Sequence, residues 1–193
     1  MKIDIILAGV GGQGILSIAS IIGAAAIDSG LYLKQAETHG MSQRGGAVVS
    51  HLRIADYPVA SDLIPQGEAD VIISVEPMEA LRYLNFLSEK GTIVTNTAAC
   101  KNIPDYPPLE KVLAEVKKIS GSIIIDAEET ARENGNPKAS NMVILGAASP
   151  FLHIDTKLIE ENIAKIFEHK GEQIVSSNKR AFKAGLEYTE QYT

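Results

Sequence analysis

Glycine dominates a short motif near the start of the chain, Gly9-Val10-Gly11-Gly12-Gln13-Gly14, which fits the pattern GxGxxG. An apolar run over residues 3–8 precedes this glycine motif and another begins at Ile15, so the motif joins a predicted strand to a predicted helix. Glycines let the backbone turn sharply and bring its N–H groups close to a ligand, and the positive end of the helix dipole points at the same place. The motif predicts either a site for a phosphate or a dinucleotide, or a tight turn that only shapes the fold. The candidate anion-binding residues are Gly9, Gly11, Gly12, Gln13 and Gly14.

A polar loop at residues 37–46 follows the second predicted strand and combines ionisable side chains with several glycines. We expect this polar loop and the glycine motif to be neighbours at the carboxyl edge of one sheet. Asn141 precedes a later apolar run, and it either caps a helix or reaches into the same cleft. The further candidate site residues are Glu37, Thr38, His39, Gly40, Met41, Ser42, Arg44, Gly45, Gly46 and Asn141.

Three residues of the polar loop each have a chemical and a structural interpretation. Glu37 lies 23 positions after Gly14, close to the acid that binds the ribose in a nicotinamide site, but acids are also common in loops. His39 is the candidate general base because histidine titrates near neutral pH; a histidine that only forms hydrogen bonds explains it as well. Arg44 can present a planar fork to a carboxylate or phosphate, or it can fix the loop through an ion pair with Glu37.

Several kinds of catalytic site are missing from the sequence. The single cysteine, Cys100, excludes an intrachain disulfide and the CxxC patterns that hold iron–sulfur clusters or structural zinc, and we expect it to be a buried, inert thiol. The patterns GxSxG, HExxH, GxxxxGK[ST] and the Gly-Asp-Gly thiamine signature are also absent. We therefore predict that the chain has no metal site and no complete catalytic constellation.

Composition indicates an ordinary globular protein. The 193 residues predict one domain over 1–193, with 45% hydrophobic and 22% charged residues. The formal charge of −6 argues against nucleic-acid binding. The first predicted strand begins at Lys2, which leaves no room for a signal peptide, and the apolar residues 15–27 are too few to span a membrane. We expect a cytoplasmic location.

The hydrophobic pattern predicts strands alternating with helices, hence an α/β fold with a Rossmann-like, mostly parallel sheet flanked by helices and a helical C-terminal region. Strands are predicted at residues 3–8, 31–36, 47–54, 71–75, 92–95 and 122–125, with a short return strand near residues 57–59. Helices are predicted at residues 15–29, 109–119, 127–133, 156–167 and 177–192, and one more runs from Pro77 until Gly91 ends it. Residues 141–148 form either a buried helix or a strand. His51 and Arg53 share one face of a strand. We expect this face to contact solvent or a partner surface, which explains the two polar residues without a catalytic role.

The glycine motif with Gln13, taken together with the sequence AETHGMSQRGG at residues 36–46, resembles the gamma-type subunit of 2-oxoacid:ferredoxin oxidoreductases. Within that group it is most similar to the beta subunit of indolepyruvate ferredoxin oxidoreductase. Pyruvate and 2-oxoglutarate members typically carry a Tyr-Gly loop with a Glu-Arg pair, where this chain reads His-Gly-Met-Ser-Gln-Arg. Residues 141–147 and 178–185 are also similar to the family, so the resemblance spans nearly the whole chain.

The resemblance implies a subunit that is inactive alone. A larger partner would carry thiamine diphosphate, Mg²⁺ and the iron–sulfur clusters, and the complex would decarboxylate a 2-oxoacid, here an indolepyruvate or another arylpyruvate, to an acyl-coenzyme A and reduce ferredoxin. Matched by position, residues 9–14 and 37–46 would lie on the coenzyme A or substrate side, near the subunit junction. No cofactor would bind to this chain by itself, no nucleic acid or membrane would be a partner, and a homodimer is compatible with the sequence. The alternatives are a free-standing NAD(P)- or FAD-binding Rossmann oxidoreductase and a regulatory nucleotide-binding module.

Overall fold

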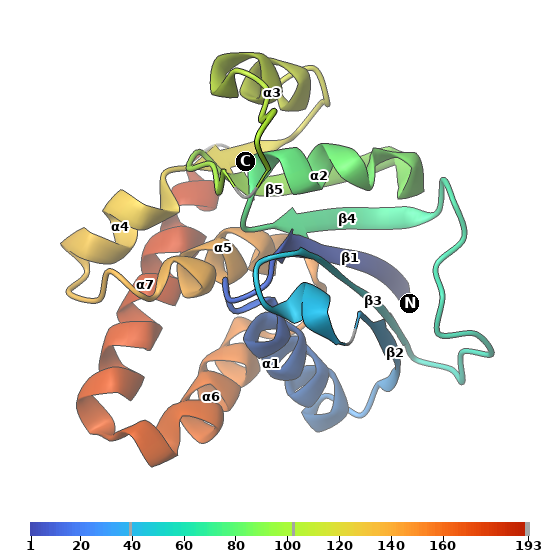
Figure 1. Cartoon of the computed structure of the whole chain (residues 1–193). Coiled ribbons are helices and arrows are strands. Elements are labelled where there is room, and N and C mark those ends of the chain that lie inside the picture. The colour runs from blue at the N-terminus through green and yellow to red at the C-terminus, as the bar shows by residue number, and fades with distance from the viewer. Residues whose placement is uncertain (39, 102, 192–193) are drawn as a thin grey trace.

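The computed structural model describes residues 1–38, 40–101 and 103–191. At its centre is a six-stranded sheet in the order β2-β3-β1-β4-β5-β6, with helices on both faces (Figure 1). The strands are β1 (Lys2–Val10), β2 (Tyr32–Glu37), β3 (Ala47–Ala55), β4 (Ala69–Ser74), β5 (Leu87–Asn96) and β6 (Ile123–Ile125). β3 runs antiparallel to both of its neighbours, and the other adjacent pairs are parallel. The predicted α/β fold is confirmed, with one reversed strand in the sheet.

Two hydrophobic cores hold the helices against the sheet. The larger core involves α1 (Ile15–Asp28), α4 (Ala127–Glu133), α5 (Ser140–Ala148), α6 (Thr156–Phe167) and α7 (Glu172–Glu190). The smaller core, on the other face, involves α2 (Pro77–Arg82) and α3 (Leu109–Val116). Short 3-10 helices lie at η1 (Met41–Gln43), η2 (Leu84–Phe86), η3 (Ser149–Phe151) and η4 (Glu168–Lys170). The predicted helical C-terminal region is confirmed, and residues 141–148 lie in a helix; the predicted end of the last helix at Tyr192 lies outside the described residues.

β1 is buried on both faces, which explains its nearly continuous apolar sequence. Ile5 and Leu7 belong to the larger core, whereas Ile6 and Ala8 belong to the smaller one, and all four are fully buried. Successive side chains of a strand point to opposite faces, so a strand between two cores carries apolar residues on both faces. β1 thereby forms a fixed support whose last residue, Val10, leads directly into the glycine motif.

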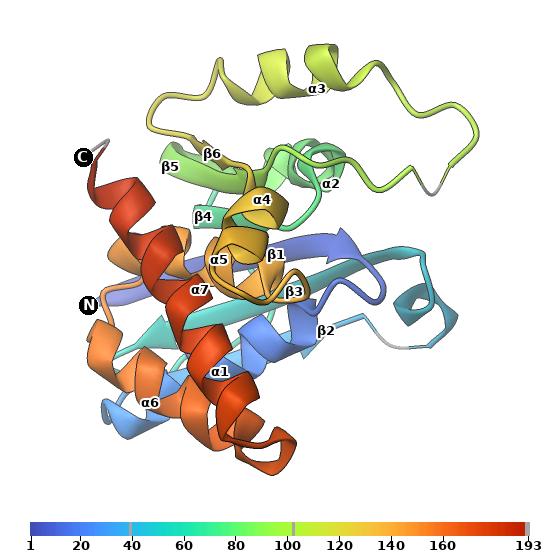
Figure 2. The same ribbon diagram turned by 90° about the vertical axis from the view of Figure 1, so that its left-hand side faces the viewer.

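α5 and α7 pack against each other (Figure 2), and a pair of glycines lies at their contact. A Cβ at Gly146 in α5 would overlap the main chain of Phe182 in α7, and a Cβ at Gly185 in α7 would overlap the main chain of Val143 in α5. The two C-terminal segments that resemble the family are therefore packed backbone to backbone. Only glycine fits at either position, because any side chain would push the helices apart.

The helix predicted from Pro77 to Gly91 is wrong in its second half. α2 ends at Arg82, η2 follows, and β5 already begins at Leu87, with Gly91 inside the strand. The spacing of the leucines in this segment is helical, but Leu87 pairs with Ala69 of β4 across a register shift. Tertiary strand pairing therefore overrides the local periodicity.

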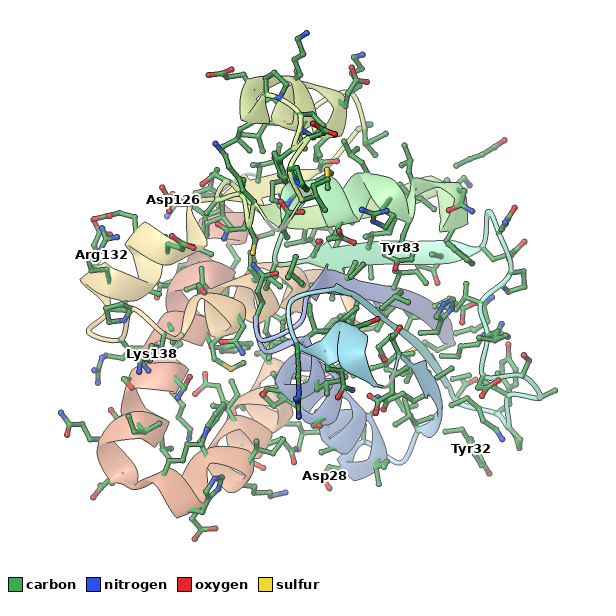
Figure 3. The ribbon with its side chains drawn as sticks, viewed as in Figure 1. Asp28, Tyr32, Tyr83, Asp126, Arg132 and Lys138 are labelled. Atoms are coloured by element: carbon green, nitrogen blue, oxygen red, sulfur yellow. The ribbon has the colours of Figure 1, made fainter. Side chains whose placement is uncertain are left out.

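The short return strand predicted near residues 57–59 is also wrong, because residues 56–68 form a loop. β3 is already flanked by β1 and β2, so it offers no free edge to which a returning strand could bind. The free edge on this side belongs to β2. Its Tyr32 is 50% exposed, and Figure 3 shows its side chain projecting outward near this edge.

The prediction that solvent or a partner explains Arg53 and His51 is wrong. The Arg53 guanidinium donates to both carboxylate oxygens of the fully buried Asp4, with distances of 2.8 Å from Nε and 3.1 Å from Nη2. His51 Nδ1 accepts a hydrogen bond from the N–H of Ile64 at 3.2 Å, and burial lowers the pKa of its imidazole. Both side chains therefore act inside the fold, where a buried charge or a ring nitrogen needs a partner.

Candidate functional site

The glycine motif and the polar loop are in direct contact at the carboxyl end of β1. β3 begins at Ala47, which pairs with Val10, so the polar loop must return to the point where the glycine motif starts. The N–H of Gly11 donates to the carbonyl oxygen of Gly46 at 2.9 Å. The prediction that the two loops are neighbours at the carboxyl edge is confirmed.

Gly11 is the point of closest approach between the two loops. A Cβ at this position would overlap the main chain of Gln43 and the carbonyl oxygen of Ser42. Glycine is therefore required at position 11 by the packing of the polar loop itself, before any ligand is considered. This differs from the sequence interpretation, in which the glycines serve the approach of a ligand.

The polar loop is closed by its own hydrogen bonds. Thr38 faces Val49 at its base, where the Thr38 N–H donates to the Val49 carbonyl oxygen at 2.9 Å. Gln43 Nε2 donates to the Thr38 carbonyl oxygen at 3.0 Å, and the Gly46 N–H donates to the Ser42 carbonyl oxygen at 2.9 Å. These contacts fix the main chain at Thr38, Ser42 and Gly46.

Only part of the glycine motif can act as an anion-binding nest. The Gly11 N–H is bonded to Gly46, and the Gln13 N–H donates to the Val10 carbonyl oxygen at 3.1 Å, while Gln13 Oε1 accepts from the Val10 N–H at 2.8 Å. Gly12 and Gly14 have positive φ values of 100° and 83°, and their N–H groups find no hydrogen-bond partner among the described residues. An anion at the start of α1 would therefore meet these two amides and the positive end of the helix.

The space beside the glycine motif is small. A pocket of about 150 Å³ lies between the motif, the first turn of α1, Gln43 and Val48. Sites that hold cofactors or drug-sized ligands usually measure about 300–1,000 Å³. The pocket can take a group such as a phosphate, but it cannot enclose a dinucleotide.

Glu37 does not lie where a nicotinamide-binding protein places its ribose acid. In such proteins the acid ends the strand next to β1, whereas here β3 lies between β1 and β2. Two strand spacings amount to about 10 Å, so Glu37 is displaced from the glycine motif. Its Oε2 accepts a hydrogen bond from Gln35 Nε2 at 3.0 Å.

Arg44 and Gly45 lie at the exposed tip of the polar loop. Within the described residues no carboxylate, including that of Glu37, lies within ion-pair distance of the Arg44 guanidinium. The ion pair between Arg44 and Glu37, the structural alternative from the sequence, is therefore not formed. His39 lies outside the described residues, and Met41 is described only through its main chain in η1.

Asn141 connects the C-terminal half of the chain to this site. It lies in the first turn of α5, where Ala139 occupies the N-cap position. Its Nδ2 donates to the carbonyl oxygen of Gly14 at 3.4 Å, and a Cβ at Gly14 would overlap the Asn141 amide. Of the two roles considered for Asn141, it reaches the glycine motif and does not cap its helix.

A buried acid that was not singled out from the sequence lies after β4. Glu76 is 1% exposed; its carboxylate accepts hydrogen bonds from the Glu79 N–H at 2.8 Å and from the Tyr106 hydroxyl. Burial, together with the bond to Glu76, raises the pKa of Tyr106. Glu79 is also buried and pairs with Arg82 at 3.0 Å, and burial raises its pKa. The available signal was an acid directly between a buried strand and a proline at a helix start, which is an N-cap position.

The remaining chemistry of the described residues is limited. No group of three or more His, Cys, Asp or Glu side chains in residues 1–38, 40–101 and 103–191 could hold a metal ion. Cys100 is half-buried, and burial followed by the charges of Glu76 and Glu128 raises the pKa of its thiol, which disfavours the reactive thiolate. Across the same residues, none of the helices combines the length and apolar character needed to cross a lipid bilayer.

Comparison with known proteins gives consistent results. The family described as pyruvate ferredoxin/flavodoxin oxidoreductase matches residues 4–188. The indolepyruvate oxidoreductase subunit IorB of Archaeoglobus fulgidus is 39% identical over 196 residues, covering 96% of this chain and 94% of the relative. The gamma subunit of a keto/oxoacid ferredoxin oxidoreductase from Geobacter sulfurreducens superposes with a TM-score of 0.70 at 22% identity, covering 98% and 99% of the two chains.

A second solved structure places the same fold inside a longer chain. The 2-oxoglutarate:ferredoxin oxidoreductase from Magnetococcus marinus, solved with 2-oxoglutarate, coenzyme A and succinyl-CoA bound, has a TM-score of 0.78 at 24% identity. The match covers all of this chain but 32% of that one. The fold is thus found both as a separate subunit and as about a third of a larger polypeptide.

Proposed function

Because the chain belongs to the pyruvate ferredoxin/flavodoxin oxidoreductase family, as a subunit of a 2-oxoacid:ferredoxin oxidoreductase, we propose that its enzyme acts on indolepyruvate or related arylpyruvates. The full-length identity of 39% to an indolepyruvate oxidoreductase subunit carries this proposal. The enzyme would convert the 2-oxoacid to an acyl-coenzyme A and reduce ferredoxin. Residues 1–193 would act as one domain, which the single sheet supports.

The redox and thiamine chemistry of this reaction would reside on a larger partner subunit. Iron–sulfur clusters need several cysteine thiolates, and the chain has one cysteine. Thiamine diphosphate sites carry a Gly-Asp-Gly signature, which this sequence lacks. These cofactors therefore do not fit this chain, and no step of the reaction is assigned to it through them.

Coenzyme A fits the carboxyl edge of the sheet only in part. The free amides of Gly12 and Gly14 and the exposed guanidinium of Arg44 suit an anionic group such as a phosphate. The pocket of about 150 Å³ is too small for the rest of the molecule, which would lie against the partner subunit. When bound, coenzyme A supplies the thiol that accepts the acyl group. The residues of this chain would hold and orient its anionic end at the subunit junction.

A free-standing NAD(P)- or FAD-binding oxidoreductase has less support. The displacement of Glu37 by β3 removes the ribose-binding geometry, and the pocket beside the glycine motif does not enclose a nucleotide. The small size of this pocket argues equally against a regulatory nucleotide-binding module.

We expect the isolated chain to be catalytically inert and to form an active enzyme only with its partner. Purified alone, it should give no dye reduction that depends on a 2-oxoacid, coenzyme A and thiamine diphosphate. Co-purified with its partner from the native host, it should support the reaction, with kcat/KM at least about tenfold higher for indolepyruvate than for pyruvate, a difference of about 1.4 kcal/mol. Turnover by the isolated chain would refute the subunit role, and a preference for pyruvate would refute the substrate class.

Replacing Arg44 tests the anion-binding role of the polar loop in that complex. Arg44→Ala should raise the KM for coenzyme A about tenfold, because a charge-assisted hydrogen bond contributes about 1.5–3 kcal/mol. Arg44→Lys should fall between the wild type and Arg44→Ala, since lysine keeps the charge but loses the planar fork. The control is Arg132→Ala on α4, where the guanidinium is paired with Glu129. An unchanged KM in Arg44→Ala would show that Arg44 is only a solvated charge.

A further inference from the structure

A spacious cavity lies at the opposite edge of the sheet from the glycine motif. It measures about 740 Å³ and is bordered by the start of β4, the middle of β5, the end of α3, the start of β6, η3 and the end of α7. In Figure 2 the C-terminal end of α7 and the starts of β5 and β6 are at the left, whereas the polar loop is at the far right. This amino-edge cavity, as we call it, is therefore separate from the candidate site described above.

One wall of the amino-edge cavity is apolar and aromatic. Phe151 of η3, Tyr188 of α7 and the isoleucines of β6 contribute to it. The Tyr188 hydroxyl donates to the carbonyl oxygen of Ile124 at 2.9 Å, which holds the ring against the strand. A fixed aromatic wall favours a ligand with a flat apolar body.

The rim of the cavity carries positive charge. Lys90 and Lys117 line it together with the imidazole of His153, and in the described part of the chain neither lysine is paired with a carboxylate. Asp70 is the single acid among its described lining residues, and its Oδ2 already accepts a hydrogen bond from the Asp4 N–H at 2.7 Å. A local excess of unpaired cations on a chain of net charge −6 attracts an anion to this place.

Two further features lie at this edge of the sheet. His153 is the one non-glycine residue with positive φ in the described chain, at 55°, and such a conformation is held only where surrounding structure imposes it. Ser122, on the cavity wall, has a buried hydroxyl with no hydrogen-bond partner among the described residues.

The geometry points to a second binding site in the amino-edge cavity, for a small anion with an aromatic body such as an aromatic carboxylate. The ring would lie against Phe151 and Tyr188, and the carboxylate would face Lys90, Lys117 and His153. An inorganic anion would leave the aromatic wall uncovered, and a neutral aromatic ring would leave the cations unpaired. The cavity volume is within the range of sites for small organic ligands.

Binding of 2-naphthoate to the full chain tests this inference. Calorimetry at low salt should show saturable binding with a dissociation constant of about 1 mM, as expected for a ligand of this size. Amide chemical shifts should change near Phe151, His153 and Tyr188 and stay constant near Gly12 and Gly14. The double variant Lys90→Gln/Lys117→Gln should bind about fivefold to tenfold more weakly, because two exposed ion pairs are lost.

Matched controls separate a specific site from general attraction. The variant Lys34→Gln/Lys138→Gln removes the same number of exposed charges elsewhere on the surface, with Lys138 labelled in Figure 3, and should bind like the wild type. The neutral amide 2-naphthamide should bind more weakly than the acid. Equal affinity for acid and amide, equal affinity in the two double variants, or chemical shift changes confined to the glycine motif would each overturn the assignment.

Discussion

Replacing Gly185 with leucine should prevent the chain from reaching its native fold. A Cβ alone at this position would overlap the main chain of Val143 in α5, and a backbone contact cannot be relieved by rotating a side chain. Domains of this kind are stable by about 5–15 kcal/mol, and overlap that separates two core helices costs more than about 4 kcal/mol. Gly146→Leu should act in the same way from the side of α5. The measurements are soluble yield and the thermal unfolding transition by circular dichroism.

The control for this prediction is Glu187→Leu, which adds a leucine to the exposed face of the same helix. It should shift Tm by only a few degrees, since surface substitutions usually change stability by less than about 0.5 kcal/mol. If Gly185→Leu folded with the Tm of the wild type, the close crossing of α5 and α7 would be refuted.

Gly11→Val is expected to detach the polar loop from the glycine motif even when no ligand is present. The side chain would overlap the main chain of Ser42 and Gln43, and the hydrogen bond from the Gly11 N–H to Gly46 would be lost. We expect a loss of about 2–4 kcal/mol in unfolding free energy, with the sheet retained, because the contact lies at its edge. Hydrogen exchange should become faster at the Gly11 amide and at the Gly46 amide, which donates within the loop.

Gly12→Ala separates this packing effect from backbone strain. Gly12 has positive φ, unlike Gly11, and no atom beyond its chain neighbours lies within 4 Å of a Cβ built there. Gly12→Ala should lower the unfolding free energy by about 1–2 kcal/mol, because alanine is strained at this φ. The polar loop should stay in place. If glycine were needed at position 11 only for a ligand, Gly11→Val would leave the stability of the ligand-free chain unchanged.

Local sequence patterns predicted those helices and strands that are specified by residues close together in the sequence. The helix expected at residues 156–167 matches α6, because Asp155 caps it by accepting from the Lys157 N–H at 2.9 Å. The charged segment at residues 127–133 likewise matches α4. The helix predicted from Pro77 to Gly91 was wrong in its second half, because Leu87 pairs with Ala69 of β4. Local periodicity does not contain a pairing between residues so far apart in the sequence. The position of β3 between β1 and β2 also depends on long-range pairing, which no local periodicity contains.

The candidate site was predicted in its outline but not in its details. The order of the predicted strands and the positions of the glycines were enough to predict that the polar loop lies next to the glycine motif. The contact of Tyr106 with Glu76 and that of Arg53 with Asp4 join residues 30 and 49 positions apart, and neither residue type nor spacing indicates them. The sequence also did not indicate that the Gly11 and Gln13 N–H groups donate to main-chain carbonyl oxygens of the protein itself. These hydrogen bonds depend on how the glycine motif folds and packs against the polar loop.

The reversed direction of β3 makes the polar loop the tip of a β-hairpin between β2 and β3. Thr38 and Val49 close the base of this hairpin, and the contact with Gly11 fixes its backbone, while Arg44 and Gly45 face outward. Side chains at the tip can thus be exchanged without disturbing the strands that support them. The tip of the hairpin is therefore a segment that can be exchanged between related subunits while the sheet stays the same. Grafting the tip of one subunit onto another is a direct way to transfer contacts across a subunit junction.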